Sequence, residues 1–228
     1  MSRNLRRQAA RMGWLLRTER ELWKQGFVYV AGCDEVGVGP LAGPVVAAAV
    51  IVSPARVVRG VDDSKTLTPP QRKRLANEIR ATALAWAIGV ASVEEIDELN
   101  VYRAALNAMQ RAILQLPLPP DFVVVDGRRI PGISAPQLPL VDGDARSYSV
   151  AAASIVAKVY RDELMCEYDS QYPCYGFAQN AGYGTPSHLA ALHKYGPCPI
   201  HRKSFAPVRQ LSLFPRPAVT ADRTTSSR

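Results

Sequence analysis

The stretch VYVAGCDEVGVGPLAGPVVAAAVIV, residues 28–52, decides the fold. Two apolar runs rich in valine and alanine flank a short segment that contains Asp34 and Glu35, followed by Gly37 and Gly39. Apolar runs bounded by glycine and proline are typical of two buried strands joined by a tight connection. Asp34 is therefore predicted where a core strand ends, beside glycines that let a ligand approach the backbone closely. An acidic residue in an ordinary hairpin turn is the competing interpretation, which this stretch alone leaves open.

Composition and charge indicate a protein with one core, a preference for polyanionic partners and no membrane span. The chain has 228 residues, of which 47% are hydrophobic, so we expect one principal core. A formal net charge of +8 favours a polyanionic partner such as nucleic acid, although it locates no site. The four cysteines have no C-x-x-C spacing and the three histidines complete no zinc pattern, which indicates a reduced, cytoplasmic protein. No apolar run reaches the length of about 18 residues that a membrane span needs, so we expect no membrane partner.

The chain divides into three parts by residue pattern. Residues 1–26 place leucine and tryptophan at helical spacing among arginine and lysine, which predicts a basic amphipathic helix leading into the core. The basic face of that helix is either solvated, the simpler interpretation, or in contact with nucleic acid. Residues 27–210 alternate strand and helix patterns, and residues 211–228 are predicted to form a disordered tail.

Two later segments repeat the arrangement of an apolar strand followed by an acidic residue. DFVVVDG, residues 121–127, is a valine run that ends in Asp126, and a short strand precedes Asp144 and a long helix that begins with small residues. In sheets of alternating strands and helices, ligand sites form at strand ends. The loop before a predicted helix start at Thr68 contains Ser64 and Lys65, which offer a hydroxyl and an ammonium to a phosphate.

Four carboxylates thus stand at structured ends: Asp34, Glu35, Asp126 and Asp144. Gathered together, they would repel one another and raise their pKa values unless cations neutralised them. Mg²⁺ and Mn²⁺ prefer oxygen ligands, and two such ions about 4 Å apart can activate a water and stabilise the leaving oxygen in a displacement at phosphorus. With the positive net charge, this set predicts a metal-dependent nuclease. For Asp144 alone, helix capping is the competing interpretation.

Several linked motifs resemble type 2 ribonuclease H, also called ribonuclease HII, over about residues 20–210. The resemblance implies an α/β fold, in which a ribonuclease H-like mixed sheet is flanked by helices and followed by a helical C-terminal portion. It also implies a monomeric endoribonuclease that cleaves the RNA strand of RNA–DNA hybrids and nicks 5′ of ribonucleotides embedded in duplex DNA. The motifs, in order and spacing, are DEVGVGPLAGPVVAAAV, DDSK, VVVDG, GDARSYSVAAASIVAKVYRDE, AGYGTPSHL and HRKSFAPV.

The resemblance assigns roles to individual residues. Asp34, Glu35, Asp126 and Asp144 match the metal-binding catalytic set. Gly37, Val38 and Gly39 match a Gly-Arg-Gly motif whose backbone contacts the 2′-hydroxyl region at the RNA–DNA junction, the group by which a protein distinguishes RNA from DNA. Tyr183 matches a tyrosine that stacks on the deoxyribose following the ribonucleotide, and Ser64 and Lys65 match a loop that contacts the substrate backbone.

The chain departs from the family pattern near the junction motif. Val38 replaces the usual arginine and removes a bidentate phosphate partner, and Ala181 and Gly184 replace a lysine and a proline. We therefore expect chemistry to persist with weaker junction binding, or with compensation by Arg128, Arg129, Arg146 or the basic N-terminal helix. A nucleic-acid-binding homologue with altered junction specificity and a metal nuclease for branched junctions are the alternatives.

The segment QLSLF, residues 210–214, is compatible with a short motif that binds a sliding clamp. Such patterns also arise by chance. A clamp is therefore a candidate partner through the C-terminal segment.

Overall fold

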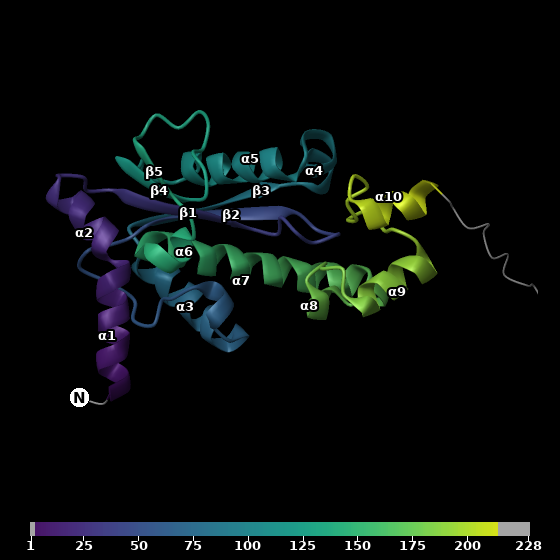
Figure 1. Cartoon of the computed structure of the whole chain (residues 1–228), viewed down its shortest axis with the longest axis horizontal. Helices are drawn as coiled ribbons and strands as arrows, with labels where there is room; N and C mark the ends of the chain where they lie inside the picture. Colours follow the sequence, from purple (N-terminus) through teal and green to yellow (C-terminus); the bar gives the residue numbers. More distant parts are fainter. Residues whose placement is uncertain (1–2, 214–228) are drawn as a thin grey trace, which may run out of the picture.

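A five-stranded mixed sheet lies between two layers of helices (Figure 1). The computed structural model describes residues 3–213 and the side chains of residues 8–211. The predicted α/β class with a mixed sheet is confirmed. In the spatial order of the sheet, the strands are β3 (Ala85–Ala91), β2 (Val45–Ile51), β1 (Val30–Val36), β4 (Phe122–Asp126) and β5 (Gln137–Leu140).

The strand register brings acidic residues together at one edge of the sheet. β1 pairs antiparallel with β2, as the opening stretch predicts, and parallel with β4. In the parallel pair Cys33 lies opposite Val125, so Asp34 and Asp126 are the next residues along the two strands. β1 runs two residues past Asp34, to Val36, so the aspartate lies inside the end of the strand and Glu35 follows it within the same strand.

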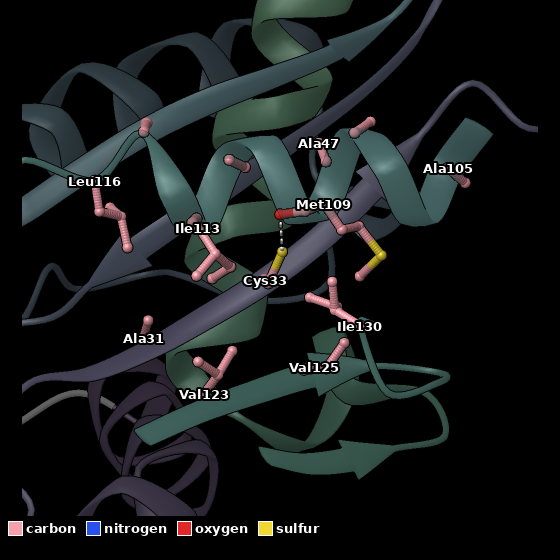
Figure 2. Close-up of a cluster of buried hydrophobic side chains, with 14 of the residues drawn as sticks. Ala31, Cys33, Ala47, Ala105, Met109, Ile113, Leu116, Val123, Val125 and Ile130 are labelled. Atoms are coloured by element: carbon pink, nitrogen blue, oxygen red, sulfur yellow. Dashed lines mark hydrogen bonds between the residues drawn. The ribbon is translucent and has the colours of Figure 1, made fainter. Parts of the chain in front are cut away.

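One face of the sheet is covered by α5 (Val101–Leu114), with the short α4 (Val93–Leu99) beside it. Figure 2 shows Cys33 of β1 directed toward this helix, where its thiol donates to the carbonyl of Met109 at 3.8 Å. The helix approaches closely because small residues meet there. A Cβ at Gly89 of β3 would lie 1.9 Å from the carbonyl oxygen of Ala108. The side chains of Ser92 and Asn100 cap α4 and α5, because each accepts a hydrogen bond from the backbone of the first helical turn.

The opposite face is covered by α7 (Tyr148–Gln171), behind which α3 (Pro69–Thr82) packs. The alanines at the start of α7, Ala151 to Ala153, are fully buried, so small residues let this helix lie close to the sheet. At Gly32 a Cβ would lie 2.0 Å from the carbonyl carbon of Ser149. No side chain separates β1 from α7 at this point. The backbone of the helix therefore fixes the position of the strand that carries Asp34.

The two ends of the described chain differ in detail from expectation. The predicted single N-terminal helix is two helices, α1 (Arg3–Leu15) and α2 (Arg17–Lys24), which are separated at Leu16, where both Leu15 and Leu16 enter the core. Residues 168–183 are rich in tyrosine and glycine but largely helical, because α7 continues to Gln171 and two short helical elements follow it. The remaining short elements are η1 (Ser64–Thr66), α6 (Gly143–Arg146), η2 (Pro173–Tyr175), α8 (Phe177–Asn180), α9 (Pro186–Tyr195) and α10 (Ala206–Leu213).

The predicted C-terminal tail overlaps the end of the described chain. Helix α10 continues through residues 211–213, and residues 214–228 lie outside the described part, where the expectation of disorder is untested. Within residues 3–213, no helix combines the length and the hydropathy needed to cross a membrane.

Candidate active site

Three of the four predicted carboxylates converge at the shared end of β1 and β4. Carboxylate oxygens of Asp34, Glu35 and Asp126 all lie within 4.8 Å of one another. Asp34 is buried, whereas Glu35 and Asp126 are half-buried at the opening. The parallel register explains the convergence, because it places the ends of the two strands side by side.

The fourth carboxylate, Asp144, reaches the same place from α6 and lines the same cavity, whose volume is about 240 Å³. The short helix is tied to the sheet through Asp126, whose carboxylate accepts a hydrogen bond from the backbone N–H of Gly143 at 2.6 Å. The cavity is lined by Asp34, Glu35, Val36, Ser64, Lys65, Arg72, Asp126, Asp144, Ser154, Lys158 and Tyr183. All four predicted carboxylates and three of the predicted substrate-contact residues therefore share one cavity.

Burial and mutual repulsion make the carboxylate cluster electrostatically unfavourable by itself. Burial, followed by the charges of Glu35 and Asp126, raises the pKa of Asp34 well above its usual range. Burial and then Asp126 raise the pKa of Glu35 to about 7, and burial raises the pKa of Asp126. A hydrogen bond from Ser154 opposes the rise at Asp34. The donor set consists of oxygens that carry excess negative charge, which fits hard divalent cations such as Mg²⁺ or Mn²⁺.

Lys65 provides a positive charge at the edge of the cluster. Its ammonium lies 3.1 Å from Asp144 Oδ2, although 80% of its side chain is exposed. The loop before it is fixed from the N-terminal helix, because Arg11 pairs with Asp62 and also donates to the carbonyl of Ala145 at 3.1 Å. Arg11 therefore connects α1 to the loop that carries Lys65 and to the helix that carries Asp144.

The remaining predicted substrate contacts lie in two groups. Ser64 is buried and its hydroxyl is 3.0 Å from that of Ser154, so it braces α7 inside the cavity wall. The Gly37–Val38–Gly39 segment follows β1 outside the cavity lining, and a Cβ at Gly39 would lie 3.5 Å from the ring of Tyr183. The ring of Tyr183, whose side chain is exposed, therefore faces this glycine loop.

Sequence reasoning missed the groups that support this loop and Tyr183. Two fully buried arginines, Arg161 and Arg202, donate to carbonyls of residues 37–44. His188 Nδ1 donates to the carbonyl of Tyr183 at 2.8 Å, and its Nε2 lies 3.0 Å from Nε2 of His201. Burial lowers the pKa of His201 to about 4, so this pair is neutral at neutral pH. No local sequence signal marked the two arginines, because Arg161 is followed by two further charged residues on α7 and Arg202 lies outside the helices.

Two of the positions that depart from the family pattern, Val38 and Ala181, lie outside the cavity lining. Val38 is half-buried and packs against the core beneath α5. Ala181 adopts a left-handed conformation with φ of 49°. The proposed compensating residues Arg128, Arg129 and Arg146 are exposed but do not line the cavity.

Comparison of the sequence with known proteins identifies one family over most of the chain. The sequence model of the family described as Ribonuclease HII matches residues 31–208. A protein named Ribonuclease HII from Anaeromyxobacter sp. (strain Fw109-5) is 52% identical over 211 residues, which cover 92% of this chain and 67% of that protein.

Two solved structures are also similar to this chain. The ribonuclease H2 from Pyrococcus horikoshii OT3 has a TM-score of 0.70 at 27% identity, and the match covers 81% of this chain and 97% of that one. A chain in the structure of the PCNA:RNase HII complex from Archaeoglobus fulgidus has a TM-score of 0.67 at 25% identity, with coverage of 78% and 95%.

The carboxylate cluster is expected to destabilise the metal-free protein at neutral pH. Asp34→Asn removes one of the repelling charges while its side-chain oxygen still accepts from the Glu35 N–H, which donates at 2.8 Å. We expect the variant to raise the free energy of unfolding, measured by urea denaturation in EDTA at pH 7.5, by at least about 1.4 kcal/mol, the equivalent of one pKa unit.

Burial, together with the same repulsion, sets the pH dependence of stability. Because the pKa of Glu35 in the folded state is about 7 against an ordinary 4.5, the wild-type free energy of unfolding falls as the pH rises between these values. Asp121→Asn is the control, because Asp121 accepts from the backbone of Val28 and Tyr29 away from the cluster. An Asp34→Asn protein no more stable than wild type would show that the repulsion is relieved in another way.

Proposed function

This chain belongs to the ribonuclease HII family and is a metal-dependent endoribonuclease, and on that premise we propose that Asp34, Glu35, Asp126 and Asp144 are its catalytic metal ligands. The observation that supports the proposal is the convergence of three carboxylates within 4.8 Å, in a cavity that Asp144 also lines. Burial raises the pKa values of the cluster, so cation binding is coupled to proton release at neutral pH.

We propose that two Mg²⁺ or Mn²⁺ ions are bound during catalysis. Such ions supply Lewis-acid chemistry, in which a water is activated and the leaving oxygen is stabilised. The protein contributes the ligand geometry. The hydrogen bond from Gly143 to Asp126 and the pairing of Lys65 with Asp144 hold two carboxylates that come from different elements in fixed orientations.

We propose that the substrate is the RNA strand of RNA–DNA hybrids and duplex DNA with embedded ribonucleotides, which is nicked 5′ of the ribonucleotide. Lys65 stands at the rim of the cavity with its ammonium available to a phosphate. Gly39 and the ring of Tyr183 face each other beside the carboxylates, where the family motif contacts the ribonucleotide and stacks on the following deoxyribose. All four cysteines of the chain are free, and we propose a reducing, cytoplasmic location.

A labelled duplex that contains one ribonucleotide tests this function directly. We expect cleavage 5′ of the ribonucleotide with Mg²⁺ or Mn²⁺, no cleavage in EDTA, and no cleavage of an all-DNA duplex. Asp34→Asn should lower kcat by at least about 1,000-fold, because it removes a ligand that acts on the reacting centre. Asp121→Asn should retain wild-type activity. Equal activity of Asp34→Asn would contradict the ligand assignment, and cleavage of long hybrids alone would contradict the junction specificity.

Val38 is expected to limit substrate binding. Val38→Arg places a guanidinium between the two glycines, so KM for the single-ribonucleotide duplex should fall by about 3- to 10-fold while kcat changes less than about twofold. Leu114→Arg adds the same charge at an exposed position at the end of α5 and serves as the control. An unchanged KM for Val38→Arg would mean that other groups already supply this contact.

We also propose a sliding clamp as a partner through residues 210–214. The similar archaeal chain is described in a complex with PCNA. Gln210 lies on α10, whereas the Leu213 side chain and Phe214 fall outside the described residues. In a pull-down with the clamp, we expect the Leu213→Ala/Phe214→Ala variant to lose binding by about tenfold or more, because such motifs insert apolar anchors. Thr224→Ala/Thr225→Ala, in the same tail, is the control, and equal binding by both variants would exclude the motif.

A further inference from the structure

Two buried cations lie beneath the glycine loop, which we define as residues 37–44. Arg161 is on α7 and Arg202 precedes α10, and both side chains have zero exposed surface. Neither arginine forms an ion pair with any carboxylate within the described part of the chain. Burial and the proximity of Arg161 lower the pKa of Arg202 only to about 9, so Arg202 is charged at neutral pH. Burial also lowers the pKa of Arg161, but arginine side chains keep their proton in proteins, so this group is charged as well.

Backbone carbonyls of the glycine loop satisfy these guanidiniums. Arg202 donates through Nη2 to Gly37 at 2.6 Å, through Nη1 to Val38 at 3.0 Å, and through Nε to Gly43 at 2.9 Å. Arg161 donates through Nε to Pro44 at 3.0 Å and through Nη2 to Ala42 at 3.1 Å. The loop therefore directs five carbonyls inward.

This arrangement dictates the glycine at position 37. Gly37 has a φ of 96°, and a Cβ there would lie 2.3 Å from Nε of Arg161. The conformation and the space both exclude a side chain. The guanidinium of Arg161 occupies the volume that a side chain at position 37 would need, which lets the loop backbone lie directly on the cation.

The same cations join the glycine loop to the segment that carries Tyr183. Arg161 Nη1 donates to the carbonyl of Ala181 at 2.9 Å, and the Leu41 N–H donates to Gly182 at 2.8 Å. The ring of Tyr183 then faces Gly39. Two substrate-contact segments that are far apart in the sequence are thus fixed against each other by one buried guanidinium and one backbone hydrogen bond.

We propose that Arg161 and Arg202 are positioning residues that set the glycine loop and Tyr183 in the arrangement that recognises the RNA–DNA junction. The proposal rests on the junction-binding role proposed above for these segments. It also gives a physical reason why Val38 is compatible with junction binding. No ion pair balances these two positive charges within residues 8–211, so they create a favourable potential for phosphate at the loop surface, where Val38 replaces the arginine of the family pattern.

The test measures discrimination in binding as well as cleavage. Arg202→Lys keeps the charge, but a single ammonium cannot replace the fork that reaches Gly37, Val38 and Gly43 together. Fluorescence anisotropy in EDTA compares the Kd for a duplex containing one ribonucleotide with that for the matching all-DNA duplex. We expect Arg202→Lys to reduce this preference by about tenfold and to change the Kd for all-DNA duplex by less than about twofold. With metal, KM for the ribonucleotide duplex should rise by a similar factor while kcat changes less than about threefold.

Controls separate positioning from general stability. Arg111→Lys is the matched substitution, because Arg111 also donates to a carbonyl, that of Val90, but beside α4 and away from the glycine loop. Circular dichroism shows whether Arg202→Lys folds. If it does not, Arg161→Lys serves as a second test, because it breaks the link to Ala181. Wild-type discrimination in both folded variants, or no junction preference in wild-type binding, would overturn the proposal. Preserved binding discrimination without cleavage by wild type would instead contradict the proposed catalytic function.

Discussion

Parallel pairing of β1 with β4 is the constraint on which the rest of the structure depends, because it places Asp34 and Asp126 side by side. The two carboxylates repel each other, so the packing of the core must keep the strand ends from moving apart. The contact of α7 with Gly32 at backbone distance makes this part of the core rigid, since no flexible side chain lies between the helix and β1. Small residues therefore let α7 approach β1 closely, and this contact supports the strand that carries Asp34.

The sheet, α6 and the N-terminal helix each contribute different residues to the site. The sheet supplies three carboxylates, and α6 supplies Asp144, which is held through Gly143 and Lys65. The N-terminal helix contributes through Arg11, which contacts both the Lys65 loop and α6. A segment that the sequence presents as a basic surface helix is therefore also a brace for the active-site walls.

Sequence patterns predicted the parts of the structure that depend on local chemistry. The valine runs, the helix start at Thr68 and the strand-end acids all follow from residue preferences over short windows, and the structure contains them. The roles of Arg161 and Arg202 were not predictable, because their acceptors lie on distant backbone whose position only the complete fold defines. The break at Leu16 was missed for the same reason, since core packing rather than helix propensity decides it.

The contact between Gly37 and Arg161 has a consequence for how this sequence can change over evolutionary time. The guanidinium of Arg161 fills the volume that a Cβ at position 37 would need, so substitutions at the two positions depend on each other. A larger residue at position 37 needs a shorter side chain at position 161 as well as a change of the local backbone conformation. A shorter side chain at position 161 leaves the carbonyls of Ala42, Pro44 and Ala181 without their donor. Both single-step routes pass through a less stable protein, so drift at either site is blocked by the other.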